Sequence, residues 1–245
     1  MERMKIIHYD SIDSTNTQAA RLAGDGASEL TVVIADTQTN GRGQAQRSFY
    51  SEKGLYMSVI LRPDQSVPLE RLNLITLYAA VCVHKVLKKH FAVPLGIKWV
   101  NDIISREGKV CGILTETSVN ANGKGVDYAV VGIGINIGKV EFPYEIKDIA
   151  AYLEPHRAVT PKLLERIGKQ IAKKLSAYRK ELKSLSFLDY YRTNCVIMDQ
   201  KVTVKPRCGE PYEATVLGIS DDGGLMTISQ KGAQVLKSAD VSVEY

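Results

Sequence analysis

The sequence predicts an α+β fold, in which a larger domain built on a mixed β-sheet is followed by a small all-β domain. Helical and strand-like apolar patterns follow one another over the first three quarters of the chain. After that, short strand-like runs are separated by PRCGEP, DDGG and QKG, which are turn sequences. We therefore assign residues 1–195 to the larger domain and 196–245 to the smaller one, which we expect to be a barrel.

The composition indicates a globular protein of the cytoplasm. The 245 residues are 44% hydrophobic and 24% charged, which are ordinary values for a chain with a packed core. No apolar run approaches the ~18 residues of a membrane helix, and the first residues contain no apolar signal region. Four widely spaced cysteines without a CxxC pair favour reduced thiols over a zinc site or disulfides. We expect neither membrane association nor export.

Each element of the larger domain has a local signal. We expect strands at 5–9, 31–36, 55–61 and 95–98, and apolar strands at 109–119 and 126–137 joined by a hairpin at Asn122-Gly123. Ser11, Asp13 and Ser14 offer N-caps for a helix that runs from about Thr15 to Ala23 and ends at Gly24. Helical apolar stripes predict a helix within 69–91 and one long helix at 161–183. The smaller domain is expected to contain strands at 201–205, 212–219, 224–229 and 234–237.

The net charge of +5 comes from one segment. Residues 162–183 hold eight basic and two acidic residues, so the rest of the chain has 24 basic against 25 acidic residues. A solvated helix face explains this excess better than a nucleic-acid surface does. Attraction of an acidic protein partner is the functional alternative.

Several familiar catalytic motifs are absent from the sequence. There is no GxxxxGK[ST] phosphate loop and no GxSxG serine motif, and the four histidines have no ligand or triad spacing. Gly132, Gly134 and Gly138 are spaced GxGxxxG after a hairpin, which does not fit a dinucleotide-binding turn.

Three other segments suggest a ligand site. The polar loop at 37–54 contains Gly41-Arg42-Gly43, where open backbone N–H groups and a guanidinium suit a phosphate or carboxylate. Lys109 enters a buried strand, which is unfavourable unless it is paired, and Asp102 is a plausible partner across the turn. Glycines inside the strand 130–136 suggest that a ligand approaches the backbone closely.

In their order along the chain, these segments resemble the biotin–protein ligases. Five motifs carry the resemblance, and they lie at residues 13–16 (DSTN), 38–43 (QTNGRG), 98–102 (KWVND), 109–116 (KVCGILTE) and 132–136 (GIGIN). The match is close over residues 8–140, and the small β domain fits the SH3-like domain that is usual in this family.

The resemblance implies an ATP-dependent enzyme with two reaction steps. Biotin attacks the α-phosphate of ATP to give biotinyl-5′-AMP, and a lysine of a biotin carboxyl carrier protein domain then attacks the acyl carbon. Mg²⁺ is expected to share the neutralisation of charge with arginine and lysine. The family contains monomers and dimers formed by sheet-edge pairing, so a homodimer is compatible with it.

The resemblance also implies roles for individual residues. Lys109, Arg42 and Asp102 are the implied catalytic residues. The implied biotin-binding residues are Ser14, Thr15, Asn16, Gln38, Gly41, Arg42, Gly43, Gln44, Lys109 and Gly112. The implied nucleotide-binding residues are Arg42, Arg47, Lys98, Asn101, Gly132, Gly134 and Asn136, with Phe142 suggested against adenine. Metal ligands are not implied.

This chain departs from the pattern Gly-Arg-Gly-Arg-x-Gly-Arg-x-Trp of many relatives. Gln44 replaces the second arginine, Gln46 the later glycine and Phe49 the tryptophan, while Arg47 is kept. Loss of a cation at Gln44 predicts weaker retention of biotinyl-AMP. Val100 also replaces the proline that is usual in the KWVND motif.

Three alternatives stay open at this point. A lipoate–protein ligase has related chemistry, although the Gly-Arg-Gly loop and the KWVND motif favour biotin. A biotin-responsive DNA-binding repressor carries a helix-turn-helix domain, and the thirteen residues before Ser14 are too few for one, so we expect no DNA binding. A noncatalytic biotin-binding protein is the third.

Overall fold

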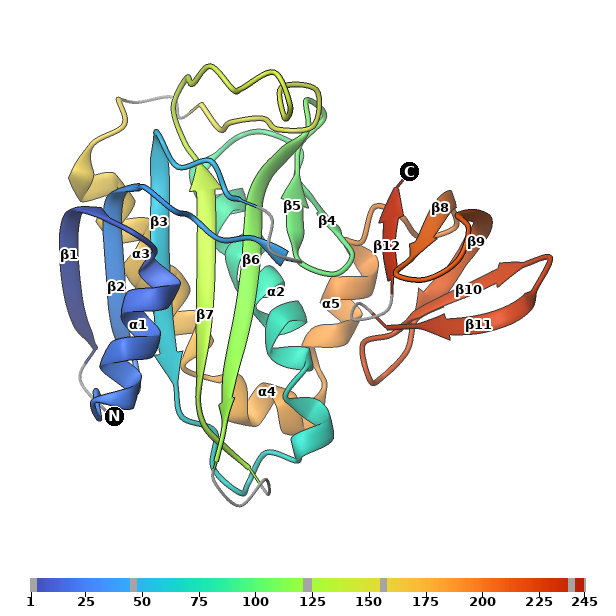
Figure 1. Ribbon diagram of the computed structural model, residues 1–245, viewed down its shortest axis with the longest axis horizontal. Helices are drawn as coiled ribbons and strands as arrows, with labels where there is room; N and C mark the ends of the chain where they lie inside the picture. The colour runs from blue at the N-terminus through green and yellow to red at the C-terminus, as the bar shows by residue number, and fades with distance from the viewer. Residues whose placement is uncertain (1–3, 45–47, 121–124, 155–157, 238–240, 245) are drawn as a thin grey trace.

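The computed structural model contains two β-sheets that lie side by side (Figure 1). It describes the whole chain except residues 1–3, 45–47, 121–124, 155–157, 238–240 and 245. The predicted α+β fold with a second, smaller β domain is confirmed. The proposed Asn122-Gly123 turn lies outside the described residues.

The larger sheet has seven strands in the order β1-β2-β3-β7-β6-β5-β4. Only β1 and β2 are parallel, and the other neighbours are antiparallel, so the sheet is mixed as predicted. The short strand β5 was not predicted, because its three residues are too few to show a period. The strands are β1 (Lys5–Ile12), β2 (Thr31–Gln38), β3 (Gly54–Leu61), β4 (Gly96–Lys98), β5 (Asp102–Ile104), β6 (Lys109–Val119) and β7 (Val126–Asn136).

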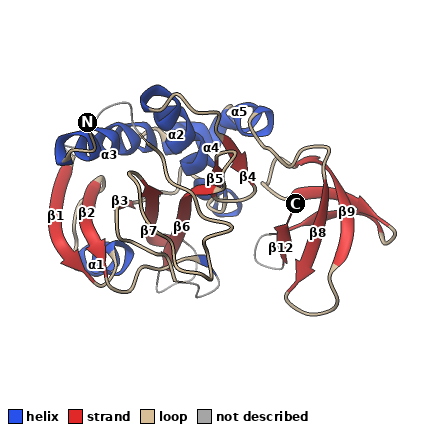
Figure 2. Cartoon of the chain, turned by 90° about the horizontal axis from the view of Figure 1, so that it is seen from above, coloured by secondary structure: helices blue, strands red, loops and turns tan. Residues whose placement is uncertain are grey.

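Helices cover both faces of this sheet (Figure 2). Helix α1 (Thr15–Gly24) packs on one face, against β2, β3 and β7. The other face carries α2 (Leu74–His90), α3 (Pro161–Leu175), α4 (Tyr178–Ser184) and α5 (Phe187–Thr193), and the short helix η2 (Leu69–Arg71) precedes α2 in the chain. Because both faces are covered, β3 is buried along almost its whole length and reads as a continuous apolar run.

The single long helix predicted at 161–183 is wrong, since the structure divides it into α3 and α4 at Ser176 and Ala177. The Ser176 hydroxyl donates a hydrogen bond to the carbonyl of Lys173, and the N–H of Ala177 donates to the carbonyl of Lys174. Such local bonds compete with helix propagation. The apolar spacing continues across the break, because Tyr178 in α4 is also fully buried. The apolar periodicity alone therefore could not locate the break between α3 and α4.

The small domain is a five-stranded antiparallel sheet in the order β11-β10-β9-β8-β12. Four strands were predicted, and β12 was not. The chain leaves α5 at Thr193 and enters β8 at Lys201, an interval that includes the predicted domain boundary. The strands are β8 (Lys201–Pro206), β9 (Tyr212–Ile219), β10 (Leu225–Ser229), β11 (Gly232–Leu236) and β12 (Val241–Glu244).

Two further findings concern the state of the cysteines and the length and apolar character of the helices. Cys82, Cys111 and Cys195 are buried, Cys208 is exposed, and all four are free. Within the part of the chain that is described, no helix combines the length and the apolar character needed to cross a membrane.

Candidate active site

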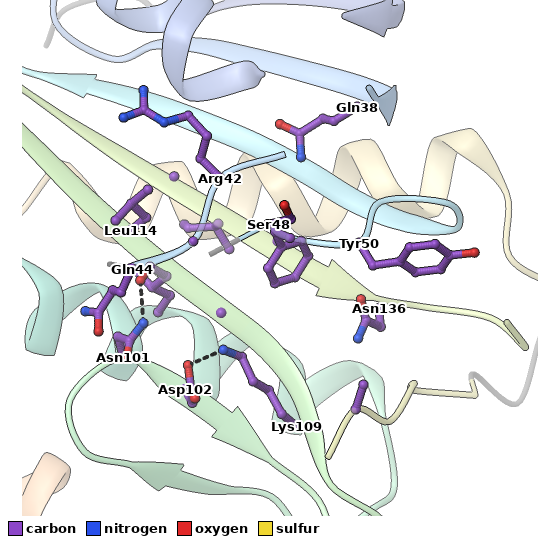
Figure 3. Close-up of a pocket in the computed structure, with 18 of the residues that line it drawn as sticks. Gln38, Arg42, Gln44, Ser48, Tyr50, Asn101, Asp102, Lys109, Leu114 and Asn136 are labelled. Carbon is purple, nitrogen blue, oxygen red and sulfur yellow. Dashed lines mark hydrogen bonds and ion pairs between the residues drawn. The ribbon is translucent and has the colours of Figure 1, made fainter. Parts of the chain in front are cut away.

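A cavity of about 480 Å³ opens on the face of the larger sheet that α1 covers (Figure 3). Four parts of the chain surround it: the start of α1, the loop after β2, the strands β5–β7, and the segment after β7. The lining residues are Ser14, Thr15, Asn16, Gln38, Arg42, Gly43, Gln44, Ser48, Phe49, Tyr50, Asn101, Asp102, Lys109, Gly112, Ile113, Leu114, Gly132, Ile133, Gly134, Asn136, Phe142, Ile146, Ile149 and Ala150.

One end of the cavity, here called the amide end, is a neutral hydrogen-bond network of Thr15, Gln38, Ser51 and Ser58. The backbone N–H and the hydroxyl of Thr15 donate to Gln38 Oε1 at 2.8 and 3.1 Å. Gln38 Nε2 donates to Ser51 Oγ at 2.9 Å, and Ser58 Oγ lies 2.8 Å from Thr15 Oγ1. Because its members hold one another in place, this end presents polar groups in fixed positions.

The start of α1 orients this network. Ser14 is the N-cap of the helix, and its side chain accepts a hydrogen bond from the N–H of Thr17. Ser14, Thr15 and Asn16 are all buried. The DSTN sequence therefore places three polar side chains at one wall of the cavity through a local capping interaction.

The opposite end, here called the charged end, contains Lys109 and Asp102. Lys109 Nζ lies 2.7 Å from Asp102 Oδ1, so the ion pair predicted from the sequence is confirmed. Lys109 is the first residue of β6 and Asp102 the first of β5, and these strands are antiparallel neighbours. Asp102 Oδ1 is buried and accepts no other hydrogen bond from the described residues. The carboxylate is thus committed to the lysine, which it holds at the cavity floor.

Glycines on β6 and β7 make room for side chains of the chain itself. A Cβ on Gly132 would lie 2.0 Å from Asn16 Oδ1, and a Cβ on Gly134 would lie 2.5 Å from the Phe49 ring. A Cβ on Gly112 would lie 3.0 Å from the same ring and 3.1 Å from Lys109 Nζ. From the sequence we expected a ligand against the glycines of β7, and in the structure side chains of the chain itself lie against Gly132 and Gly134. Asn16 and Phe49 are the groups that do so.

The KWVND motif connects the cavity to the small domain. Asn101 Nδ2 donates to the carbonyl of Ile113 at 2.7 Å, which fixes the turn before β5. Trp99 Nε1 donates to the carbonyl of Gly223 in the small domain at 3.0 Å. Lys98, although predicted as a nucleotide-binding residue, is not among the residues that line the cavity.

The loop after β2 folds over the cavity. The N–H of Phe49 donates to the carbonyl of Gly41, and Arg42 pairs with Ser48 in an isolated antiparallel bridge. Arg42 and Gly43 line the cavity, whereas Gly41 is not among the lining residues. Arg42 Nη2 donates to Glu116 Oε1 at 2.8 Å, and Arg47 lies outside the described residues.

Comparison with known proteins decides the family. The model of the biotin/lipoate A/B protein ligase family matches residues 9–136, which is more than half of the chain. The chain belongs to the biotin/lipoate A/B protein ligase family.

Individual relatives in this family match over almost the whole chain. The bifunctional ligase/repressor BirA of Bacillus spizizenii is 33% identical over 97% of this chain and 74% of its own length. The biotin–[acetyl-CoA-carboxylase] ligase of Paracoccus denitrificans is 30% identical over 94% of this chain and 96% of its own. The solved structure of the Aquifex aeolicus biotin protein ligase in complex with biotin and ATP superposes with a TM-score of 0.79, at 28% identity and 98% coverage of both chains.

The structure brings most of the residues that the family resemblance implied to one cavity. Of the implied residues, only Gly41 and Lys98 are described but do not line it, and Arg47 is not described. The implied residues that line it are Ser14, Thr15, Asn16, Gln38, Arg42, Gly43, Gln44, Asn101, Asp102, Lys109, Gly112, Gly132, Gly134 and Asn136.

Sequence reasoning missed two parts of the cavity wall. The first is the aromatic group formed by Tyr50 and Phe142, whose ring centroids are 6.2 Å apart in an edge-to-face arrangement; only Phe142 was suggested. The second is the segment that contains Ile146, Ile149 and Ala150. Its backbone pairs with that of Lys109, since the N–H of Lys109 donates to the carbonyl of Ile149 at 2.8 Å. This segment has no periodicity, so no local signal predicted it.

The described lining of the cavity contains no Ser–His or Cys–His pair. None of its described lining residues is a histidine or a cysteine. Burial raises the pKa of the neighbouring Cys111 thiol far above its ordinary value, so this thiol stays protonated.

Proposed function

We propose that this cavity catalyses the ATP-dependent joining of biotin to a carrier protein. In the first step, a carboxylate oxygen of biotin attacks the α-phosphorus of ATP, which forms biotinyl-5′-AMP and releases pyrophosphate. In the second step, the amine of a carrier lysine attacks the acyl carbon, the amide bond forms, AMP leaves with the bonding electron pair, and the amine loses a proton. The observation that carries this proposal is a neutral amide end facing a lysine–carboxylate pair within one cavity.

The amide end suits the ureido ring of biotin. That ring has N–H donors and a carbonyl acceptor but no charge, and it can exchange hydrogen bonds with Ser14, Thr15, Asn16 and Gln38. Groups that are already fixed lose little entropy when the ligand binds. A ligand without matching polar groups would leave them unpaired, which disfavours its binding.

The charged end suits the carboxylate of biotin and the phosphate that it attacks. Lys109 stabilises the negative charge that grows during the attack, and Asp102 orients the lysine through the 2.7 Å ion pair. Two anions must approach each other in this reaction, so a cation held at the meeting point supplies both positioning and electrostatic stabilisation. Arg42 supplies a second cation from the loop.

The nucleotide lies towards the segment after β7. Asn136 lies at the end of β7, and its Nδ2 donates to the carbonyl of Ala151 in this segment at 2.9 Å. Asn101 and Gly134 also line the cavity, and we assign them to the nucleotide as the family pattern implies. The Tyr50–Phe142 pair offers an aromatic surface for adenine. Gly132 lies beneath Asn16 instead, so we assign it to the support of Asn16. Nucleotide-binding roles for Arg47 and Lys98 stay predictions from the family pattern.

Mg²⁺ accompanies the nucleotide. Asp102 is the one carboxylate among the described lining residues, and it is paired with Lys109. This donor set fits Mg²⁺ that is held mainly by the phosphates of ATP, a common arrangement for this ion. When bound, the ion would neutralise charge on the leaving pyrophosphate. The grouping of His8, Asp10 and Asp36 is exposed and outside the cavity.

The carrier is the biotin carboxyl carrier protein domain of a biotin-dependent carboxylase. The carrier lysine must enter the cavity on the α1 face, whereas the basic helix α3 covers the opposite face (Figure 2). We therefore keep a solvated face as the interpretation of that helix. Free thiols support a cytoplasmic location, and the absence of DNA binding stays a prediction.

Labelling of a carrier tests this proposal. The chain is incubated with biotin, ATP, Mg²⁺ and a purified carrier domain, and biotinyl-lysine is detected by mass spectrometry. We expect a single modified lysine that depends on both biotin and ATP. An unmodified carrier, alongside normal labelling by a known biotin protein ligase, would reject the proposal.

A further inference from the structure

We propose that Glu116 is a positioning residue that competes with the substrate phosphate for Arg42. The inference deepens the proposed function, in which Arg42 neutralises phosphate charge. Arg42 Nη2 donates a charge-assisted hydrogen bond to Glu116 Oε1 at 2.8 Å. The partners are 74 residues apart in the sequence, so this contact closes the loop after β2 against strand β6.

The Glu116 carboxylate is held in a fixed position. Asn16 Nδ2 donates to Glu116 Oε2 at 2.8 Å. Asn16 is itself buried, with its Oδ1 2.6 Å from Ser58 Oγ and its amide filling the space that Gly132 leaves free. One carboxylate oxygen thus binds an immobile amide while the other binds the arginine. Glu116 is therefore an acceptor that Asn16 orients towards Arg42.

This acceptor is remote from the charged end. Lys109 Nζ lies beside Gly112, and Glu116 follows four residues later on β6, which is about 13 Å along a strand. Figure 3 shows the Arg42 side chain directed away from Lys109 and Asp102. While Arg42 is bonded to Glu116, it therefore cannot contact a phosphate that Lys109 also contacts. To serve the reaction, the guanidinium must exchange one anion for the other.

This competition predicts the direction in which a substitution of Glu116 changes phosphate affinity. Removal of the charge of Glu116 removes the competing anion, so phosphate binding should become tighter. The ion pair is partly exposed to solvent, and the effect is therefore modest. We expect an affinity gain of about three- to tenfold for a nucleotide when Glu116 is replaced by glutamine.

Calorimetric titration of α,β-methylene-ATP, in the presence of Mg²⁺ and saturating biotin, tests the inference. This analogue cannot release pyrophosphate, so the measurement reports binding without turnover. Glu116→Gln should lower its Kd about three- to tenfold, because glutamine keeps an oxygen for Asn16 but loses the charge. In an Arg42→Ala background, the same substitution should leave Kd unchanged. The control Asp127→Asn removes an exposed negative charge from the same sheet and should have no effect.

Three results would overturn the inference: unchanged binding in Glu116→Gln, weaker binding, or the same gain when Arg42 is absent. If Glu116→Gln does not fold, Glu116→Asp provides the test, since the shorter side chain retracts the carboxylate and should still tighten binding. Failure of the wild-type chain to bind the analogue would contradict the proposed function itself. Failure of the inference about Glu116 can therefore be distinguished from failure of the proposed function.

Discussion

The two ends of the cavity differ in charge and in the kind of interaction that holds them. The amide end is uncharged, buried and hydrogen-bonded within itself, with Thr15 and Gln38 at its centre. The charged end is an ion pair between neighbouring strands that remains partly open to solvent. A fixed neutral network discriminates between ligands, because a wrong ligand leaves polar groups unpaired. A held cation stabilises charge that appears only during reaction. Under the proposed function, the amide end selects the ligand and the charged end catalyses the reaction.

The largest effect should come from the charged end. Lys109→Ala removes the cation at the reacting carboxylate and should slow formation of biotinyl-AMP by about a thousandfold. Single-turnover formation of the adenylate at saturating biotin and ATP measures this. The matched control is Lys89→Ala, an exposed lysine on α2 across the sheet, which should leave the rate unchanged. Full activity of the Lys109 variant would refute its assignment.

An intermediate effect should come from the amide end. Gln38→Ala removes the acceptor of two hydrogen bonds from Thr15, and the unpaired donors should raise the KM for biotin roughly tenfold to a hundredfold. The maximal rate should change little, because the charged end stays intact. Gln18→Ala, on the same helix but bonded to Tyr9, serves as control. A lower maximal rate with an unchanged KM would contradict the assignment of biotin selection to the amide end and of catalysis to the charged end.

The smallest effect concerns the loop between the ends. Gln44 lines the cavity at a position where many relatives have arginine. Gln44→Arg should add one partly exposed cation near the phosphate and slow the release of biotinyl-AMP about two- to fivefold. Release is measured by rapid filtration after a single turnover. Equal release from both proteins would show that this position does not retain the intermediate.

The sequence was sufficient for the charged end. A lysine that opens a buried strand needs a partner, and Asp102 lies across the turn from Lys109, so burial and spacing predicted the pair. All strands except β5 and β12, the first helix and the small β domain were predicted for similar reasons, because apolar periods and turn residues are local signals. Capping residues before Thr15 likewise predicted where the first helix begins, and the structure shows that Ser14 is the cap.

Contacts between distant segments could not be predicted. Glycines indicated a close approach to the sheet, but periodicity does not tell that Asn16 and Phe49 are the groups that approach. The pairing of Arg42 with Glu116 depends on the path of a loop that has no period. The wall formed by Ile146 and Ile149 was missed for the same reason. The break at Ser176 was missed for a different one, because the apolar period continues across it to Tyr178.

Pyrophosphate exchange with two different acids tests the central claim most directly. The wild-type chain is assayed for ATP–pyrophosphate exchange with biotin and, separately, with lipoate. The account predicts exchange with biotin alone, because only the ureido ring satisfies the amide end while its carboxylate reaches Lys109. Exchange driven by lipoate with equal or higher kcat/KM would contradict it, since the amide end would then not discriminate biotin from lipoate.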